Sequence, residues 1–178
     1  MKKFITLLLV MMLVLTSFAA CGSTEEGGSA ASGSVEGTPA EIIDAIYEQH
    51  PVADLPLGTM DVDLADADAV MMFTGLSSAD KIAEAAVSES MMGAQAYSLV
   101  VVRVKDAADA EAVANEMLNG IDQRKWICVE ADDLRVAAAG DVVVLMMVSS
   151  AHADVATAAG IIEAFGTVAG GLDLDLTK

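Results

Sequence analysis

The chain has 178 residues, of which 54% are hydrophobic and only 4% aromatic, and its formal net charge at pH 7 is −18. Of its 9 basic residues, Lys2 and Lys3 stand at the extreme N-terminus, so 7 basic and 27 acidic residues remain from residue 21 onward, a net charge of −20. So acidic a surface repels nucleic acid and anionic lipid head groups. The composition therefore argues against nucleic-acid binding and against electrostatic docking on a membrane.

Residues 1–20 have the pattern of a lipoprotein signal peptide. Lys2 and Lys3 precede the apolar run 4–15, which is too short to span a bilayer of about 30 Å but fits the hydrophobic part of a secretory signal. The following segment 18–21 (FAAC) resembles a lipobox, and this resemblance implies cleavage before Cys21 and a thioether-linked lipid on its sulfur. Alternatively, cleavage after Ala19 would leave Cys21 as a free thiol.

A lipidated Cys21 places the protein at the outer, extracytoplasmic face of the cell membrane. Each buried CH₂ contributes about 0.8 kcal/mol, so two or three acyl chains such as palmitate hold the protein permanently. Residues 21–37 are rich in Gly, Ser and Glu and are expected to form a flexible tether with a root-mean-square reach of roughly 20–24 Å. The tether would lift the domain clear of the lipid head groups.

The first elements after the tether carry clear boundary signals. Thr38-Pro39-Ala40-Glu41 predicts a helix start with a capping box, and His50-Pro51 predicts its end. The alternation over 59–64 indicates a short strand. Asp66 or Asp68 is expected to cap a short helix that ends at Gly75. Residues 80–91 fit a helix and a strand equally well.

The second half of the chain contains the strongest patterns. The predicted elements are a buried strand over 97–105, a helix from Asp106 to about Asn119, an extended segment over 126–129, a hairpin of 134–138 and 142–148 around Gly140-Asp141, a helix over 152–165 and a short tail over 167–178. This order predicts a single-domain α+β fold over residues 38–166, with a mainly antiparallel sheet and helices packed on one face.

Two features could suggest a metal, but both have simpler explanations. The acidic run from Asp61 to Asp68 lacks the Gly at the sixth position and the Glu at the twelfth that a calcium loop of the EF-hand type requires. Adjacent methionines at 71–72, 91–92 and 146–147 could supply thioethers to Cu(I), but adjacent side chains point in different directions and are better suited to filling an aromatic-poor core. We expect no metal and no other cofactor.

No catalytic constellation is recognised, so we expect the protein not to be an enzyme. The histidines are His50 and His152, and the cysteines are Cys21 and Cys128, which is too few for a usual zinc site without carboxylates. Cys128 is expected to be a buried, inert thiol. The sequence also lacks a nucleophile elbow, a phosphate-binding glycine loop and a dinucleotide fingerprint.

The segment Arg124-Lys125-Trp126 is the candidate interaction site. It is the one basic patch of an acidic chain, and an exposed Trp126 within it could anchor a partner protein or a sugar. The alternative is that Trp126 packs against the edge of the sheet.

The chain resembles the domain of unknown function 4358 family of small Gram-positive bacterial lipoproteins. The resemblance rests on the signal ending in Cys21, the polar tether, the segment 88–92, the strand ending in 101–106 with the helix after it, and the turn at Gly140-Asp141, and it covers roughly residues 40–150. An aromatic residue would be expected just after Gly140, where this chain has Asp141. The family has no assigned activity, so the resemblance implies no functional residues.

These observations predict a membrane-anchored lipoprotein that serves as a non-catalytic interaction or accessory module of the cell envelope. Its expected partners are the membrane, through Cys21, and an envelope protein. The alternative is a binding protein for a small molecule or cation that serves a transporter.

Overall fold

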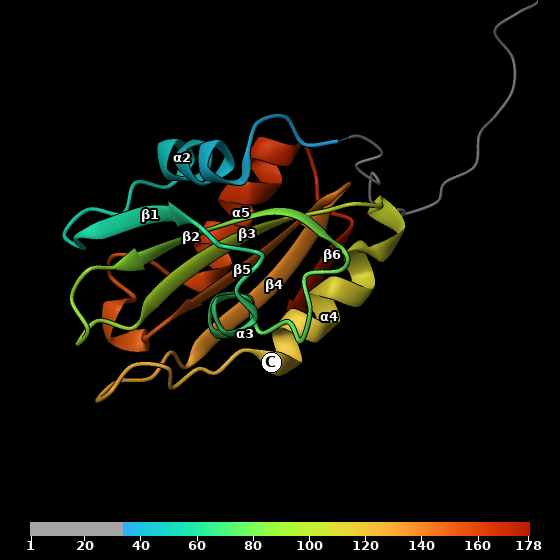
Figure 1. The fold of residues 1–178 in the computed structure, drawn as a ribbon. Helices are drawn as coiled ribbons and strands as arrows, with labels where there is room; N and C mark the ends of the chain where they lie inside the picture. Colours follow the sequence, from blue (N-terminus) through green and yellow to red (C-terminus); the bar gives the residue numbers. More distant parts are fainter. Residues whose placement is uncertain (1–33) are drawn as a thin grey trace, which may run out of the picture.

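A computed structural model describes residues 34–178 as a six-stranded antiparallel sheet with four helices and two short 3₁₀ turns. The strand order across the sheet is β1-β2-β3-β5-β4-β6 (Figure 1). The elements are α2 (Pro39–Gln49), β1 (Leu57–Asp61), α3 (Ala67–Thr74), β2 (Ile82–Ser90), β3 (Tyr97–Val104), η1 (Ala107–Asp109), α4 (Ala110–Gly120), β4 (Asp133–Ala139), β5 (Val142–Val148), η2 (Ser150–His152), α5 (Ala158–Ala169) and β6 (Leu174–Thr177).

Local sequence signals explain most of the element boundaries. Thr38 and Glu41 form the predicted capping box at the start of α2, and the Asp66 carboxylate accepts hydrogen bonds from the backbone of Asp68 and Ala69 at the start of α3. Gly140, with φ of 55°, forms the predicted turn between β4 and β5. Residues 82–90, which fitted a helix and a strand equally well, form β2.

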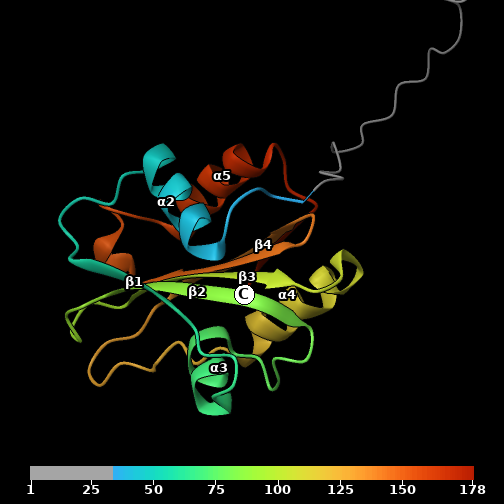
Figure 2. The ribbon, with the colours of Figure 1, turned by 45° about the horizontal axis from the view of Figure 1, so that its top comes forward.

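The sheet is covered on both faces, so the expectation of helices on one face only is wrong, although the α+β single-domain class is confirmed. Helices α2 and α5 pack on one face, and α3 and α4 lie on the other (Figure 2). Strands β3 and β5 are buried along nearly their whole length. A strand with apolar side chains on both of its faces needs a helix layer on each side to remove them from water.

The C-terminal part of the chain departs from the predicted boundaries. The last helix starts at Ala158, after the Thr157 cap, and runs on to Ala169. The expected tail over 167–178 instead completes that helix and forms the edge strand β6, which pairs with β4. The alternation of Leu174 and Leu176 with acidic residues is therefore the pattern of a half-buried strand.

The methionine pairs divide between the core and the surface. Met146 and Met147 are fully buried on opposite faces of β5, as the core-filling interpretation predicts. Met71 and Met72 on α3, and Met91 and Met92 in the turn between β2 and β3, are instead exposed. For these two pairs the core-filling interpretation is wrong, because α3 buries only Val70 and Thr74 and the turn carries Met91 and Met92 beyond the end of β2.

Candidate functional site

The candidate site centres on the loop between α4 and β4, residues 121–132. The loop is closed at its base, where the backbone N–H of Ala131 donates to the carbonyl of Gln123 at 3.0 Å and the Gln123 side chain donates to the carbonyl of Ala131 at 2.6 Å. The interaction segment predicted from the sequence, Arg124 to Trp126, lies inside this closed loop.

Lys125 points inward, and its side chain is only 9% exposed. Its ammonium forms an ion pair with the carboxylate of Glu89 on β2 and lies 3.2 Å from the Oγ of Ser98 on β3. It also lies 5.4 Å from the ring centroid of Phe73 on α3 and 5.3 Å from that of Trp126. The loop is therefore fixed to two strands and a helix through one charged group.

Lys125 is a buried cation whose ion-pair partner among the described residues is Glu89. Burial lowers the pKa of the Lys125 amine, and the Glu89 carboxylate acts in the opposite direction. A lysine with a lowered pKa can serve as a nucleophile when it is accessible. Here the Glu89 carboxylate and the two rings occupy its surroundings, so the arrangement suits anchoring of the loop.

Exposed apolar side chains surround this buried pair. Met60 on β1 is 49% exposed and pairs with Val87 on β2. Val87 lies two residues before Glu89 on the same face of the strand, so Met60 is a diagonal neighbour of Glu89. Met91 is 73% exposed, and its side chain lies against Gly58, the register partner of Glu89. Ile127, at the tip of the loop, is 97% exposed.

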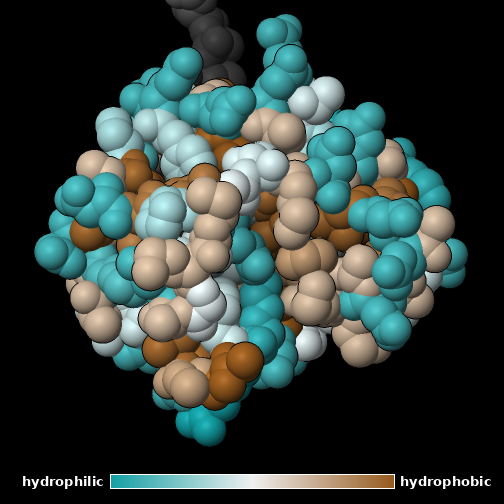
Figure 3. Space-filling view, turned by 60° about the vertical axis from the view of Figure 1, so that its left-hand side comes forward, coloured by the Kyte–Doolittle hydropathy of each residue, from teal (hydrophilic) through white to brown (hydrophobic). Residues whose placement is uncertain are grey.

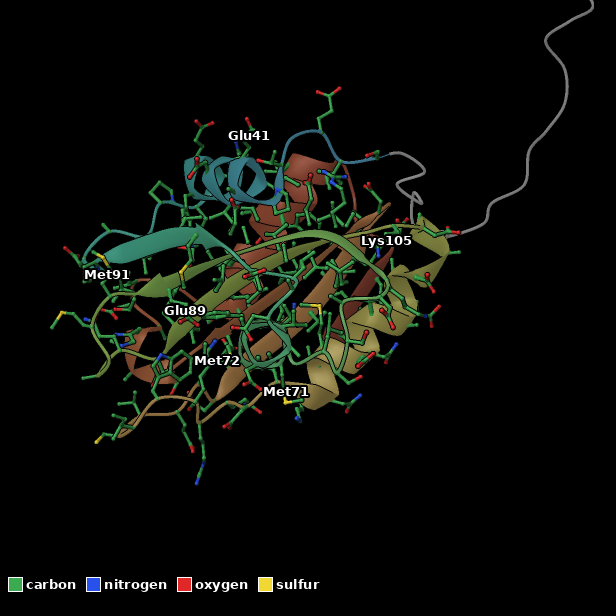
Figure 4. All side chains as sticks on the ribbon, viewed as in Figure 1. Glu41, Met71, Met72, Glu89, Met91 and Lys105 are labelled. Atoms are coloured by element: carbon green, nitrogen blue, oxygen red, sulfur yellow. The ribbon has the colours of Figure 1, made fainter. Side chains whose placement is uncertain are left out.

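We call this surface the methionine face and define it by Met60, Phe73, Met91, Trp126 and Ile127. Figure 3 turns toward the viewer the side of the molecule that carries the β2–β3 turn, and it shows hydrophobic surface in separate patches among hydrophilic residues. Figure 4 shows Met91 projecting from that turn and Met72 on α3, with Glu89 between them in the view. Exposed large hydrophobic side chains that gather at one end of a domain are typical of an interaction surface.

The opposite end of the sheet carries a second polar cluster. The Arg103 guanidinium forms an ion pair with Asp141 in the β4–β5 turn and donates to the carbonyl of Val35 at 2.8 Å and to the Oγ of Ser34 at 3.2 Å. Although partial burial opposes it, the Arg103 charge holds the pKa of Asp141 below its usual value. Asp141, which stands where the resemblance implied an aromatic residue, thus helps fix the N-terminal segment of the domain.

A cavity of about 650 Å³ lies beside this second cluster, and Ala108, Glu111, Gly140, Asp141 and Asp173 are among its lining residues. Asp173 accepts a hydrogen bond from the backbone N–H of Gly140 at 2.8 Å. The cavity is predominantly apolar and has carboxylates at its wall. It therefore offers space for a small ligand with a cationic group.

The structure changes the interpretation of the predicted interaction residues. Arg124 is exposed but forms an ion pair with Glu130, and Lys125 is buried, so the two cations do not form a free basic patch. Trp126 is half-buried and packs against the core on the α3/α4 face, close to the second alternative that the sequence offered. Cys128 was expected to be buried, but it lies exposed in the same loop.

Other candidates from the sequence have little support in the described residues. Cys21 and the signal segment lie outside the described range. Within residues 34–178, no group of three or more His, Cys, Asp or Glu side chains is placed to hold a metal ion. Of the run from Asp61 to Asp68, Asp63 and Asp66 accept local backbone hydrogen bonds. Among the described helices, none is both long and apolar enough to cross a bilayer.

Comparisons with family models, with curated proteins and with solved structures each find no match to this chain. The resemblance to the domain of unknown function 4358 family therefore stays a prediction.

Sequence reasoning missed the residues that hold Lys125. Glu89 lies 36 positions before Lys125 and Phe73 lies 52 before it, so no local spacing connects them. One signal was available, namely a lone lysine between an arginine and a tryptophan in an acidic chain. Such a cation is expected to find a buried carboxylate if its loop packs on the sheet.

Proposed function

We propose that the protein is a membrane-anchored, extracytoplasmic lipoprotein that serves as a non-catalytic interaction module of the cell envelope. The anchor is a lipid on Cys21, and the domain binds a protein partner through the methionine face. The FAAC segment supports the anchor, and the exposed apolar side chains of the methionine face support the binding role.

The observation that carries the binding role is the exposure of Ile127. A nearly fully exposed isoleucine costs free energy in water and contributes nothing to the fold of an isolated domain. The loop that carries it is nevertheless held by a closed base and by the Lys125–Glu89 pair. A fixed loop with an apolar tip loses little conformational entropy on binding, which favours recognition of a partner.

Site-specific photo-crosslinking in intact cells tests this proposal. A photoreactive amino acid replaces Ile127 in one variant and Glu163, which lies on α5 at the other face, in a matched control. We expect a discrete crosslinked species from position 127 only, and we expect Met60→Gln with Met91→Gln to weaken it. Equal patterns from both positions, or no species from position 127, would contradict the binding role.

Mass spectrometry of the membrane-extracted protein tests the anchor separately. The expected N-terminal peptide begins at Cys21 and carries the added mass of acyl chains. An unmodified Cys21, or a mature chain that begins at residue 20 after cleavage behind Ala19, would refute lipid anchoring.

The second candidate function is binding of a small cationic molecule for a transporter. The cavity beside Asp141 supports it, because apolar walls and carboxylates suit an organic cation. Thermal-shift measurements with primary amines, polyamines and divalent cations test it. We expect stabilisation that Glu111→Gln removes, whereas a flat response to all of these compounds would refute it.

A further inference from the structure

We propose that the partner presents a cationic amphipathic segment to the methionine face. This inference rests on the proposed function, because it keeps the same surface and adds the chemistry of the segment that binds there. Three properties of the described residues lead to it, namely the charge balance, the arrangement of apolar and acidic side chains, and the position of the face relative to the N-terminal segment.

The charge balance is the first step. All seven basic residues of the described range bind groups of the chain itself. Five form ion pairs with carboxylates and two donate to backbone carbonyls: Lys81 with Asp109, Arg103 with Asp141, Arg124 with Glu130, Lys125 with Glu89, Arg135 with Asp175, Lys105 with the Asp80 carbonyl and Lys178 with the Leu118 carbonyl. Most acidic side chains within residues 34–178 therefore have no ion-pair partner among the basic residues of this range, and the surface attracts positive charge.

The arrangement of side chains is the second step. Met60, Met91 and Ile127 form an apolar rim around a Lys125 charge that Glu89 already neutralises. An exposed carboxylate stands beside this rim, because Asp122 at the start of the loop is close enough to act on the charge of Lys125. An apolar centre on a strongly acidic domain complements a segment that has an apolar stripe and basic flanks.

The chemistry of the rim also suits such a segment. Methionine side chains are flexible and polarisable, so they adapt to apolar side chains of different shapes. Ile127, by contrast, is presented on a loop that hydrogen bonds and the Lys125–Glu89 pair hold in place. The face thus combines one fixed apolar anchor with adaptable neighbours.

Charge and geometry disfavour two other candidates for binding the methionine face, namely a second copy of the chain and the lipid bilayer. A second copy of the chain would bring another strongly acidic surface against the first, and like charges repel. The bilayer would approach from the side of the N-terminal segment, because Ser34 is held at Arg103. Ser98, beside Lys125, lies five residues away from Arg103 along β3, a separation of about 16 Å. The methionine face therefore lies at the end of the sheet away from Ser34, where the described part of the chain begins.

Fluorescence anisotropy with the full chain, reconstituted in phosphatidylcholine vesicles, tests the inference. The probes are three labelled 18-residue peptides: a helix of leucine and lysine with one apolar stripe, the same helix with glutamate in place of lysine, and a shuffled leucine–lysine peptide without a stripe. We expect the first peptide to bind, with an affinity that falls as salt rises. We expect the glutamate peptide not to bind and the shuffled peptide to bind at least tenfold more weakly.

Variants connect this binding to the methionine face. The triple variant Met60→Gln, Met91→Gln, Ile127→Ser is expected to lower the affinity for the first peptide at least tenfold. Met71→Gln is the matched control, because Met71 is similarly exposed but lies on the flank of α3 opposite to Phe73. We expect it to change the affinity less than twofold. Asp122→Asn is expected to reduce the salt dependence.

The possible results separate this inference from the proposed function. A discrete crosslink from position 127 in cells, together with no peptide binding or equal binding of all three peptides, would overturn the cationic partner and leave the interaction role standing. Sedimentation that shows dimers of the chain, abolished by the triple variant, would assign the methionine face to a second copy and would also overturn it. The absence of both the crosslink and peptide binding would refute the inference and the proposed function together.

Discussion

The ion pair between Lys125 and Glu89 gives the sharpest test of how the loop 121–132 is held. Lys125→Met keeps a similar length of apolar chain between the Phe73 and Trp126 rings but removes the ammonium. The Glu89 carboxylate then stays largely buried without its cation. Breaking a fully buried pair in this way costs about 3–5 kcal/mol. Because the Glu89 side chain keeps 20% exposure to water, we expect a smaller loss of unfolding free energy, about 2–3 kcal/mol.

Urea unfolding measures this loss, and Trp126, the single tryptophan of the chain, reports release of the loop through its fluorescence. The double variant Glu89→Leu, Lys125→Met is expected to recover most of the stability, because replacing both charges by apolar groups is often neutral. Lys81→Met, which removes an exposed ion pair with Asp109, is the matched control and should leave the urea midpoint unchanged. Equal stability of the Lys125→Met variant and the double variant would refute the reasoning.

Two further predictions concern the close approach of Gly120 to Gly75 and the ionisation of the two tyrosines. A Cβ added at Gly120 would clash with the backbone carbonyl of Gly75, so Gly120→Ala should lower the unfolding free energy by about 1–3 kcal/mol. Gly93→Ala is the control, because a Cβ at Gly93 meets no neighbour and should leave the unfolding free energy unchanged. Burial raises the pKa values of Tyr47 and Tyr97, so the folded phenols keep their protons to a higher pH than those of the unfolded chain, which ionise above a pH of about 10. Stability should therefore be intact below that pH and should fall above it by at most about 1.4 kcal/mol per pH unit for each tyrosine. Because these are the only tyrosines, tyrosinate absorbance should rise together with unfolding, and a rise in the folded state would contradict the burial argument.

Local signals allowed much of the fold to be predicted. The capping box at Thr38, the strand that starts at Tyr97 and the turn at Gly140 each depend on residues within a few positions of one another. The expectation of one covered face was wrong, although the sequence held the contrary signal. The unbroken apolar run over 99–102 places buried side chains on both faces of β3, and each face then needs its own helix layer.

The candidate site could not be predicted in the same way. The sequence indicated Arg124, Lys125 and Trp126 as a candidate interaction segment, with packing of Trp126 against the sheet edge as the alternative. The positions of Lys125 and Trp126 depend on Glu89 and Phe73, which lie far away along the chain. The exposure of Met91 was also missed, although its neighbours gave a signal. Ser90 and Gly93 flank the pair 91–92, which is typical of a turn, whereas Leu145 and Val148 flank the buried pair 146–147.

The strong negative charge and the exposed apolar rim are best understood together. An isolated domain with Met60, Met91 and Ile127 exposed at one end risks self-association through the hydrophobic effect. A net charge of −18 opposes that association, because two copies repel each other before their apolar surfaces meet. The same charge attracts a basic partner and increases its rate of encounter. The acidity of the chain can therefore keep the methionine face free of other copies while it favours a cationic segment.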